Sequence, residues 1–466
     1  MSDIFPGHVF REYDVRGLVA TELTPAFAET LGRAYGAYLL ERNSGARGFA
    51  LGRDHRLSST ALAEAFSRGA RTFGLEAFDI GVVPTPLTYF AAQVLPVDGL
   101  CMITGSHNPP EYNGFKIGVG KSTLAGPEVQ ELKQRALSVH AGQLKAPSSA
   151  KEGRETKFSV NDFYVSLITQ TLGVAKRKLK IVCDAGNGTG GLIGPTLLRA
   201  LGHEVIELFC ELDGTFPNHH PDPTVEKNLI DLQAAVRQHK ADLGIAWDGD
   251  SDRIGAVDEN GTILWGDQLL ILFARDLLKE VPGAAIVGEV KCSQTLYDDV
   301  AARGGRPIMW KAGHSLIKSK MKEEHALLAG EMSGHMFFGH RWYGFDDGIY
   351  SAARLSELIA RDGRRMSAML DGIPKTYASP EIRFDFAEDK KFAAVKLATE
   401  RLRKTGKTIE VDGVRVIIDG AWGLVRASNT QPLLVLRWEA TSEEGLKRIQ
   451  DLIEGTVKTI REELGG

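Results

Sequence analysis

Hydrophobic and polar positions follow a pattern that recurs three times along the chain: an apolar run, a polar or glycine-rich loop, an amphipathic segment and a second apolar run. Short apolar runs of this kind predict buried strands, and the spacing within the amphipathic segments predicts helices. The sequence therefore predicts three strand–helix–strand units, whose first strand and helix are residues 49–52 with 58–74, 180–183 with 191–202, and 285–288 with 293–304.

Each unit continues to a later strand that runs directly into a small polar, charged loop. The three loops are TGSHN at 104–108, DGDSD at 248–252 and GEMSG at 330–334. Ligands of open α/β sheets gather outside the carboxyl ends of the strands. We therefore expect the three loops to converge on one site between domains.

The last hundred residues have a different pattern. Apolar runs at 414–418, 423–427 and 433–440 surround a turn at 419–420, and an amphipathic helix is expected from about 442 to 464. Consecutive hairpins followed by a helix predict a small antiparallel α+β domain. The predicted fold is thus α/β, with three related α/β domains and a smaller C-terminal α+β domain.

The length of 466 residues allows about three domains, or four smaller ones. Boundaries are expected at 145–156, which is rich in proline, serine and charge, just after the aspartate loop, and at 362–374. We therefore expect domains at residues 1–148, 149–253, 254–364 and 365–466.

Composition excludes several classes of protein. With 43% hydrophobic and 25% charged residues and a net charge of -4, the chain is typical of a globular protein and has no general basic field for nucleic acid or an anionic membrane. The longest uncharged stretch, 80–97, contains three prolines, and no signal peptide is visible at the N-terminus. A cytoplasmic, monomeric enzyme is the default expectation. The four widely spaced cysteines are expected to be reduced packing residues.

The aspartate loop is the strongest chemical signal. Asp248, Asp250 and Asp252 follow an apolar strand, and three carboxylates so close together need a cation, for which oxygen ligands favour magnesium. An EF-hand would require glycine where Arg253 stands. Two other interpretations stay open here: a solvated acidic turn, and the nucleophilic aspartate of haloacid dehalogenases, which this strand followed by Asp-x-Asp resembles.

The other polar loops offer complementary chemistry. Ser106 is a candidate nucleophile, with His107 and Lys116 as possible activating groups. Glu331 and Ser333 can exchange hydrogen bonds with neighbouring sugar hydroxyls. The loop RASNT at 426–430 has a composition suited to phosphate. Each loop alone is equally compatible with an ordinary polar turn.

A competing signal is the pattern Gly186-x-Gly188-x-x-Gly191, with Glu207 about 20 residues further on. This pattern matches a dinucleotide-binding fingerprint and would indicate an oxidoreductase. It leaves the aspartates and Ser106 without a role, so we favour a simple backbone turn.

Taken together and in this order, the motifs resemble the α-D-phosphohexomutase superfamily, specifically its bacterial phosphomannomutase/phosphoglucomutase branch. The resemblance extends from FREYDVRG at 10–17 through the four loops to RASNT. It implies four domains around a deep central cleft. Met332 and the SNT of the last loop favour hexose phosphates over glucosamine phosphate.

The resemblance also implies residue roles. Ser106 would be the phosphoserine and, with the three aspartates, would hold Mg²⁺; Arg253 would lie beside the same phosphoryl group. Glu331 and Ser333 would bind sugar hydroxyls. The non-reacting phosphate would be bound by Arg426, Ser428, Asn429 and Thr430, and the cleft would be completed by Tyr13, Arg16, Lys116, Lys291, His314 and His335.

The implied reaction converts a hexose 1-phosphate into a 6-phosphate through a hexose 1,6-bisphosphate that reorients in the site. Glucose 1,6-bisphosphate would act as activator and intermediate. The general acid and base stay open among Arg16, His107, Lys116 and His335. The alternatives are an aspartyl-phosphate phosphotransferase or phosphatase, an oxidoreductase, and a noncatalytic sugar-phosphate sensor.

Overall fold

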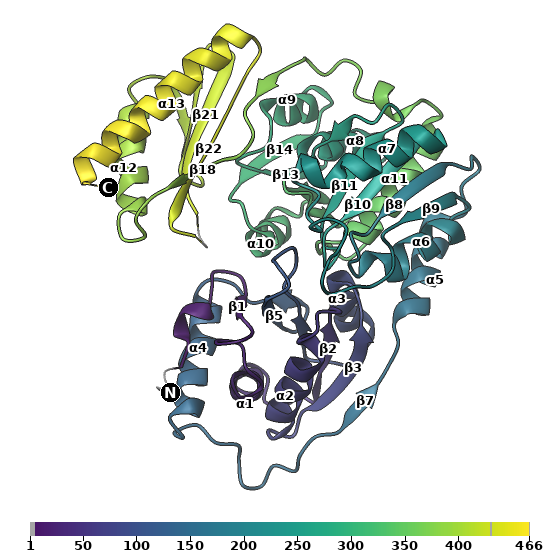
Figure 1. Cartoon of the computed structure of the whole chain (residues 1–466), viewed down its shortest axis with the longest axis vertical. Coiled ribbons are helices and arrows are strands. Elements are labelled where there is room, and N and C mark those ends of the chain that lie inside the picture. Colours follow the sequence, from purple (N-terminus) through teal and green to yellow (C-terminus); the bar gives the residue numbers. More distant parts are fainter. Residues whose placement is uncertain (1–4, 429–430, 466) are drawn as a thin grey trace.

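The computed structural model describes residues 5–428 and 431–465. Over these residues the strands form four sheets, and Figure 1 shows them as successive units along the chain, from purple at the N-terminus to yellow at the C-terminus. The first three sheets mix parallel and antiparallel strands, and the fourth is antiparallel.

The first sheet has the strand order β1-β5-β4-β2-β3-β7, with β6 paired to β5. Its elements, with the short η1 (Gly7–Val9), are β1 (Val15–Leu18), α1 (Pro25–Arg42), β2 (Gly48–Arg53), α2 (Ser59–Arg71), β3 (Glu76–Val82), α3 (Thr85–Val94), β4 (Gly99–Ile103), β5 (Tyr112–Val119), β6 (Ser122–Thr123), α4 (Pro127–His140) and β7 (Glu155–Lys157).

The second sheet has the order β12-β11-β10-β8-β9. Its elements, with the short η2 (Glu226–Leu229), are α5 (Asn161–Leu172), β8 (Lys180–Asp184), α6 (Gly190–Ala200), β9 (Glu204–Leu208), α7 (Ile230–His239), β10 (Leu243–Trp247), β11 (Ile254–Asp258) and β12 (Ile263–Leu264).

The third sheet has the order β14-β13-β15-β16. Its elements, with the short η3 (Met366–Ala368), are α8 (Gly266–Glu280), β13 (Ala285–Glu289), α9 (Gln294–Ala302), β14 (Arg306–Trp310), α10 (His314–Glu324), β15 (Leu328–Gly330), β16 (Met336–Phe338) and α11 (Gly348–Asp362).

The fourth sheet has the order β17-β22-β21-β20-β19, with β18 paired to β22. Its elements are β17 (Tyr377–Ala378), β18 (Ile382–Asp385), α12 (Lys391–Leu402), β19 (Lys407–Ile409), β20 (Val414–Ile418), β21 (Ala421–Ala427), β22 (Leu433–Ala440) and α13 (Glu443–Leu464). Strand β21 begins two residues before the predicted start, because Asp419 and Gly420 alone form the hairpin turn. Both have positive φ, 45° and 73°, as a two-residue turn requires.

The first three sheets repeat one arrangement. The parallel units β2-α2-β3, β8-α6-β9 and β13-α9-β14 each place a further parallel strand, β4, β10 or β15, beside their first strand. That strand is followed by an antiparallel neighbour, β5, β11 or β16. The predicted repeat and fold class are confirmed, with helix ends moved by one to three residues.

The sheets extend beyond the expected division of the chain. Strand β7 joins the first sheet although it follows residue 148, and β11 and β12 join the second sheet although they follow residue 253. For the second sheet the reason is hairpin pairing, because β11 folds back along β10 immediately after the aspartate loop. The four-domain division stays a proposal, with its second boundary better placed after Leu264.

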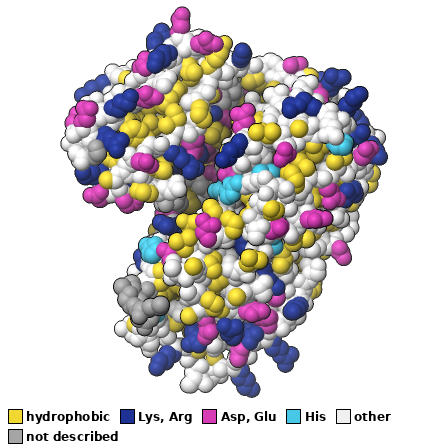
Figure 2. All heavy atoms as spheres, viewed as in Figure 1, with side chains coloured by type: hydrophobic (Ala, Val, Ile, Leu, Met, Phe, Trp, Pro, Cys, Tyr) yellow, Lys and Arg dark blue, Asp and Glu magenta, His cyan; other side chains and the backbone are white. Residues whose placement is uncertain are grey.

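Hydrophobic packing groups the sheets unequally. One core cluster joins the second and third sheets and extends to α3 and to Ala50, Ile80 and Leu100 of the first sheet. The first and fourth sheets each have a further cluster of their own, and a small cluster of Val290, Trp422 and Leu424 connects the third and fourth units. Figure 2 shows the surface hollowed between the C-terminal unit and the rest of the molecule, with charged and histidine side chains around the hollow. Among the described helices, none has the length and apolar character needed to cross a membrane.

Candidate functional site

The serine loop follows β4 and lies at the carboxyl end of the parallel part of the first sheet. Ser106 is buried and its backbone has φ 49°, in the left-handed region. Its Oγ donates a hydrogen bond to Asp248 Oδ2 at 3.0 Å and lies 3.1 Å from His107 Nδ1. The serine and aspartate loops, 142 residues apart, therefore meet as predicted.

The aspartate loop forms a buried oxygen cluster. One carboxylate oxygen from each of Asp248, Asp250 and Asp252 lies within 4.8 Å of the others, and all three residues are buried. Asp250 Oδ1 has no hydrogen-bond partner among the residues that the structure describes. Three buried carboxylates with an unpaired oxygen fit a hard divalent cation, which oxygen ligands prefer. The residues present can hold a metal ion.

Lys116 supplies the nearest positive charge. From β5 its Nζ reaches Asp250 Oδ2 at 2.7 Å and Asp252 Oδ2 at 2.5 Å. Burial opposes its charge, but these two carboxylates hold the pKa of Lys116 well above its ordinary value. Lys116 is thus a fixed cation in this arrangement.

The pKa values of two carboxylates in the cluster, Asp248 and Asp252, are shifted in opposite directions. Burial and the neighbouring charges of Asp252 and Asp250 raise the pKa of Asp248 well above its ordinary value. Burial also opposes the charge of Asp252, but Lys116 and His335 hold the pKa of Asp252 well below its usual range. Burial acts on both carboxylates in the same sense, and their neighbours set the difference: like charges crowd Asp248, whereas Asp252 has cationic partners. A bound cation would relieve the crowding at Asp248.

The sugar loop between β15 and β16 is joined to the aspartate loop. Arg253 and His335 form an isolated β-bridge, and Ile254 N donates to Gly334 O at 3.0 Å. His335 Nδ1 lies 2.9 Å from Glu331 Oε2 and 3.1 Å from Ser333 Oγ. Burial opposes the charge of His335, yet Asp252 and Glu331 raise its pKa to about 9.

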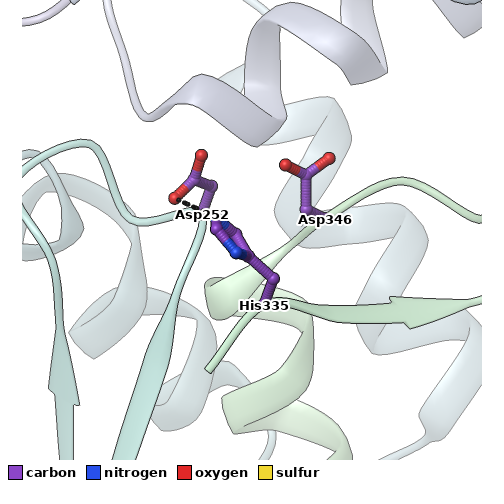
Figure 3. A group of neighbouring side chains, drawn as sticks. All are labelled: Asp252, His335 and Asp346. Atoms are coloured by element: carbon purple, nitrogen blue, oxygen red, sulfur yellow. Dashed lines mark ion pairs between the residues drawn. The ribbon is translucent and has the colours of Figure 1, made fainter. Parts of the chain in front are cut away.

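Asp346 is a further buried carboxylate beside these loops. It groups with Asp252 and His335, and Figure 3 shows the imidazole of His335 lying between the two carboxylates, with its ion pair to Asp252 dashed. Lys318 Nζ lies 3.0 Å from Asp346 Oδ1 and His314 Nδ1 lies 3.5 Å from Asp346 Oδ2. Lys318 is therefore the cationic partner of Asp346, because burial and the charges of Lys318 and Lys116 hold the pKa of His314 well below its ordinary value.

Residues of the first sheet reach across to the third. Tyr13 donates to Ala312 O at 3.1 Å, and its ring lies 5.7 Å from that of His314. Arg16, in β1, donates to Asn108 Oδ1 of the serine loop at 3.2 Å. Tyr13 and His314 thus meet each other, and Arg16 lies at the serine loop.

The predicted cleft residue Lys291 and the predicted phosphate-binding residue Arg426 are each paired with a carboxylate. Lys291 Nζ lies 2.9 Å from Glu381 Oε2, and Arg426 Nε lies 3.0 Å from Asp412 Oδ2. Ser428 Oγ accepts a hydrogen bond from Gln431 N at 3.1 Å. Asn429 and Thr430 lie outside the described residues.

The competing motifs have structural explanations. In the glycine-rich loop, a Cβ on Gly191 would lie 2.0 Å from Cys210 O, and one on Gly188 would lie 2.9 Å from Gly249 O. Close backbone packing requires these glycines, so the fingerprint needs no nucleotide. The EF-hand interpretation was correctly set aside, since β11 begins at Ile254 and ends the loop.

Sequence reasoning missed several site residues. Asp346, Glu381 and Asp412 contact the predicted site residues His314, Lys291 and Arg426, and Lys318 pairs with Asp346. None of the four belongs to a loop that the patterns singled out. The adjacent carboxylates of Asp346 and Asp347, after an apolar strand and a turn, were the available signal. The others are single charges in otherwise ordinary polar segments.

The first three sheets bring a serine, an acidic cluster and a polar loop together, which defines a multidomain α/β protein with one composite site. Sequence comparison identifies the family. The chain matches phosphoglucomutase/phosphomannomutase domain I over residues 7–140, domain II over 162–261, domain III over 265–377 and the C-terminal domain over 381–455.

Individual relatives agree. The chain is 47% identical to a phosphomannomutase/phosphoglucomutase of Pseudomonas aeruginosa, covering 98% of this chain and 96% of that protein, and 43% identical to a phosphoglucomutase of Neisseria meningitidis, covering 97% of both. A crystal structure of a phosphoglucomutase/phosphomannomutase family protein from Burkholderia thailandensis matches with a TM-score of 0.89 and 41% identity, covering 98% of each chain. The chain belongs to the phosphoglucomutase/phosphomannomutase family, and the predicted family and enzyme class are confirmed.

Proposed function

We propose that this enzyme interconverts hexose 1-phosphates and hexose 6-phosphates, with glucose and mannose as the sugars, through a phosphoserine at Ser106. The observation that carries the proposal is the contact between Ser106 Oγ and Asp248 at the edge of a buried acidic cluster. A hydroxyl beside cation-binding carboxylates is suited to exchanging a phosphoryl group.

The proposed reaction has two transfers. The hydroxyl oxygen of the sugar forms a bond to the phosphorus on Ser106 as the bond from Oγ breaks, which yields a hexose 1,6-bisphosphate. The bisphosphate turns end for end. Ser106 Oγ then forms a bond to the other phosphorus as the bond from that phosphorus to the sugar oxygen breaks, which regenerates the phosphoserine and releases the product hexose phosphate. Each transfer also moves a hydroxyl proton between the sugar oxygen and Ser106 Oγ. Arg16, His107, Lys116 and His335 are the candidate general acids and bases, and Lys116, held protonated by Asp250 and Asp252 despite its burial, can act only as the acid.

The cation proposed for Asp248, Asp250, Asp252 and Ser106 is Mg²⁺, which when bound would supply positive charge beside the phosphoryl oxygens. Lys116 and Arg253 supply protein charge at the same end of the site. Glu331 and Ser333 would orient the sugar through its hydroxyls, and Arg426 and Ser428 would hold the phosphate that does not react. Glucose 1,6-bisphosphate would prime the enzyme by phosphorylating Ser106.

The decisive experiment is phosphopeptide mass spectrometry after incubation with Mg²⁺ and glucose 1,6-bisphosphate, with Ser106→Ala as the matched control. We expect an acid-stable, hydroxylamine-resistant phosphate on Ser106 and loss of most turnover in the variant. A hydroxylamine-labile phosphate on Asp248 would instead establish aspartyl-phosphate chemistry. Near wild-type rates in Ser106→Ala would also overturn the proposal.

Dual sugar specificity is a separate prediction. Glu331 and Ser333 would contact hydroxyls that glucose and mannose display identically, so the configuration at C2 would be poorly sampled. We expect similar kcat/KM for glucose 1-phosphate and mannose 1-phosphate. A difference above about a hundredfold, almost 3 kcal/mol of transition-state discrimination, would contradict it.

The proposal also covers the partners, the cellular location and the oligomeric state of the enzyme. Free sugar phosphates are the proposed small-molecule partners, and the enzyme is proposed to act as a cytoplasmic monomer, without nucleic acid or membrane. Size-exclusion chromatography with light scattering at working concentration tests the monomer.

A further inference from the structure

Arg56 lies directly beneath the serine loop, outside every motif that the sequence singled out. The parallel strands β2 and β4 are neighbours, and Arg53 is in register with Ile103. The segments that follow the two strands therefore emerge side by side at one edge of the sheet. The second of them carries Ser106, and the first carries Asp54 and Arg56.

All five N–H groups of the Arg56 guanidinium are used. Nε donates to Asp54 Oδ2 at 3.2 Å. The other four donate to backbone carbonyls of the serine loop: Ser106 O at 2.8 Å, Asn108 O at 2.5 Å, Pro109 O at 2.6 Å and Tyr112 O at 3.1 Å. A guanidinium has five donors in a fixed plane, so one side chain gathers four carbonyls of a single loop.

Asp54 anchors Arg56 and also binds the serine loop directly. Its Oδ2 also accepts from Gly105 N at 3.1 Å, and its Oδ1 accepts from Arg56 N at 3.0 Å. Arg56 is only 2% exposed, and a Cβ on Gly105 would lie 2.5 Å from the guanidinium carbon. A side chain larger than hydrogen at position 105 would therefore displace the guanidinium.

The contacts of Arg56 bear directly on Ser106, the residue proposed to carry the phosphoryl group. Ser106 has φ 49°, a conformation that L-residues with side chains rarely adopt and that must be held by its surroundings. Arg56 binds the carbonyl of Ser106 itself. That carbonyl also packs against the aspartate loop, since a Cβ on Gly249 would lie 2.5 Å from Ser106 O.

We propose that Arg56, anchored by Asp54, is a positioning residue that holds the serine loop so that Ser106 Oγ faces the acidic cluster for phosphoryl transfer. This inference rests on the phosphoserine of the proposed function. Arg56 touches neither the proposed sugar site nor the acidic cluster directly among the contacts of the described residues, so it acts through the loop backbone.

The test compares Arg56→Lys with Arg53→Lys. Lysine keeps the charge but has three donors, so at least one loop carbonyl loses its partner and the planar geometry is lost. Arg53 ends the same strand and pairs with Asp79 at 2.6 Å, away from the serine loop, which makes its variant a matched control. Each enzyme is first phosphorylated with glucose 1,6-bisphosphate.

The measurement is the single-turnover loss of phosphate from Ser106 after mixing with glucose 1-phosphate, normalised to phosphorylated protein so that unfolded enzyme does not count. We expect Arg56→Lys to slow transfer at least about tenfold, with KM changed less than about threefold, and Arg53→Lys to match wild type. Asp54→Asn, which loosens the anchor more mildly, should slow transfer in the same direction.

Equal transfer rates in Arg56→Lys and Arg53→Lys would overturn the inference while leaving the proposed function intact. A raised KM with unchanged transfer in Arg56→Lys would do the same. If wild-type enzyme carries no phosphate on Ser106, the proposed function and this inference both fall.

Discussion

At the scale of single residues, the site depends on charges that are buried and mutually compensated. Lys116 neutralises part of the acidic cluster from within, and removing one partner of a buried ion pair typically costs 3–5 kcal/mol. The same side chain therefore ties protein stability to the cation. This coupling can be measured without an activity assay.

We expect Lys116→Met to destabilise the metal-free protein and to make Mg²⁺ more stabilising, because the ion would replace the lost charge. The measurement is the melting temperature with and without Mg²⁺. Lys318→Met is the control, since Lys318 pairs with Asp346 rather than with the three aspartates. An unchanged Mg²⁺-dependent shift in Lys116→Met would refute the coupling.

A second prediction at this scale concerns His203. It is 5% exposed, and its Nδ1 accepts from Leu179 N at 3.3 Å. Within the described part of the chain, its Nε2 has no hydrogen-bond partner. Burial lowers its pKa to about 4. Below pH 6.5 the unfolded chain binds a proton that the folded protein does not, so stability falls as pH decreases toward 4.

This histidine accounts for at most about 3 kcal/mol of acid destabilisation. His203→Asn keeps an acceptor for Leu179 N but cannot titrate. Urea unfolding at pH 7 and pH 4.5 should therefore show a smaller loss of stability in the variant than in wild type. Equal losses would mean that His203 does not contribute.

At the scale of elements, two glycines in helices that pack on the sheets differ in how much space surrounds them. In α6, a Cβ on Gly194 would lie 2.3 Å from the ring of Trp247, the residue before the aspartate loop. In α13, a Cβ on Gly455 would meet nothing within 4 Å. The first glycine is required by packing, and the second is only a weak point in its helix.

Substitution of alanine for glycine should therefore change the free energy of unfolding in opposite directions at these two positions. We expect Gly194→Ala to destabilise the protein by about 1–3 kcal/mol through overpacking, and Gly455→Ala to stabilise it by about 0.5–1 kcal/mol because alanine favours the helix. Chemical denaturation of wild type and both variants measures these changes in the free energy of unfolding. A neutral Gly194→Ala would show that α6 moves freely away from Trp247.

At the scale of the whole molecule, the proposed substrate would bridge two units whose described residues share only a small hydrophobic cluster, Val290 with Trp422 and Leu424. Glu331 lies in the third unit and Arg426 in the fourth, which has its own hydrophobic cluster. The two units are already joined by Arg415, which donates to Val290 O at 2.7 Å and Cys292 O at 2.8 Å. Motion about this buried attachment would close the hollow seen in Figure 2.

We therefore expect the radius of gyration from solution X-ray scattering to decrease when glucose 1,6-bisphosphate binds. Inorganic phosphate alone cannot bridge the two units and serves as the control. Identical dimensions with and without the bisphosphate would rule out closure of the fourth unit.

Much of this organisation was predictable from the sequence because it is local. Alternating apolar runs and helical spacing established the three repeated units, and the two-residue turn at Asp419 and Gly420 established the last hairpin. The order of motifs identified the family. The loops at Ser106, Asp248 and Glu331 followed from strands that end in polar residues, a pattern visible within ten residues.

Only the tertiary structure decided which distant groups meet. Arg56 braces the loop of Ser106 because β2 and β4 are adjacent, and Asp346 reaches His335 because the chain turns back before α11. A single charge in a polar segment has no periodicity to mark it, and its partner lies tens to hundreds of residues away. Sequence therefore determined the elements and their chemistry, while packing decided their contacts, burial and pKa.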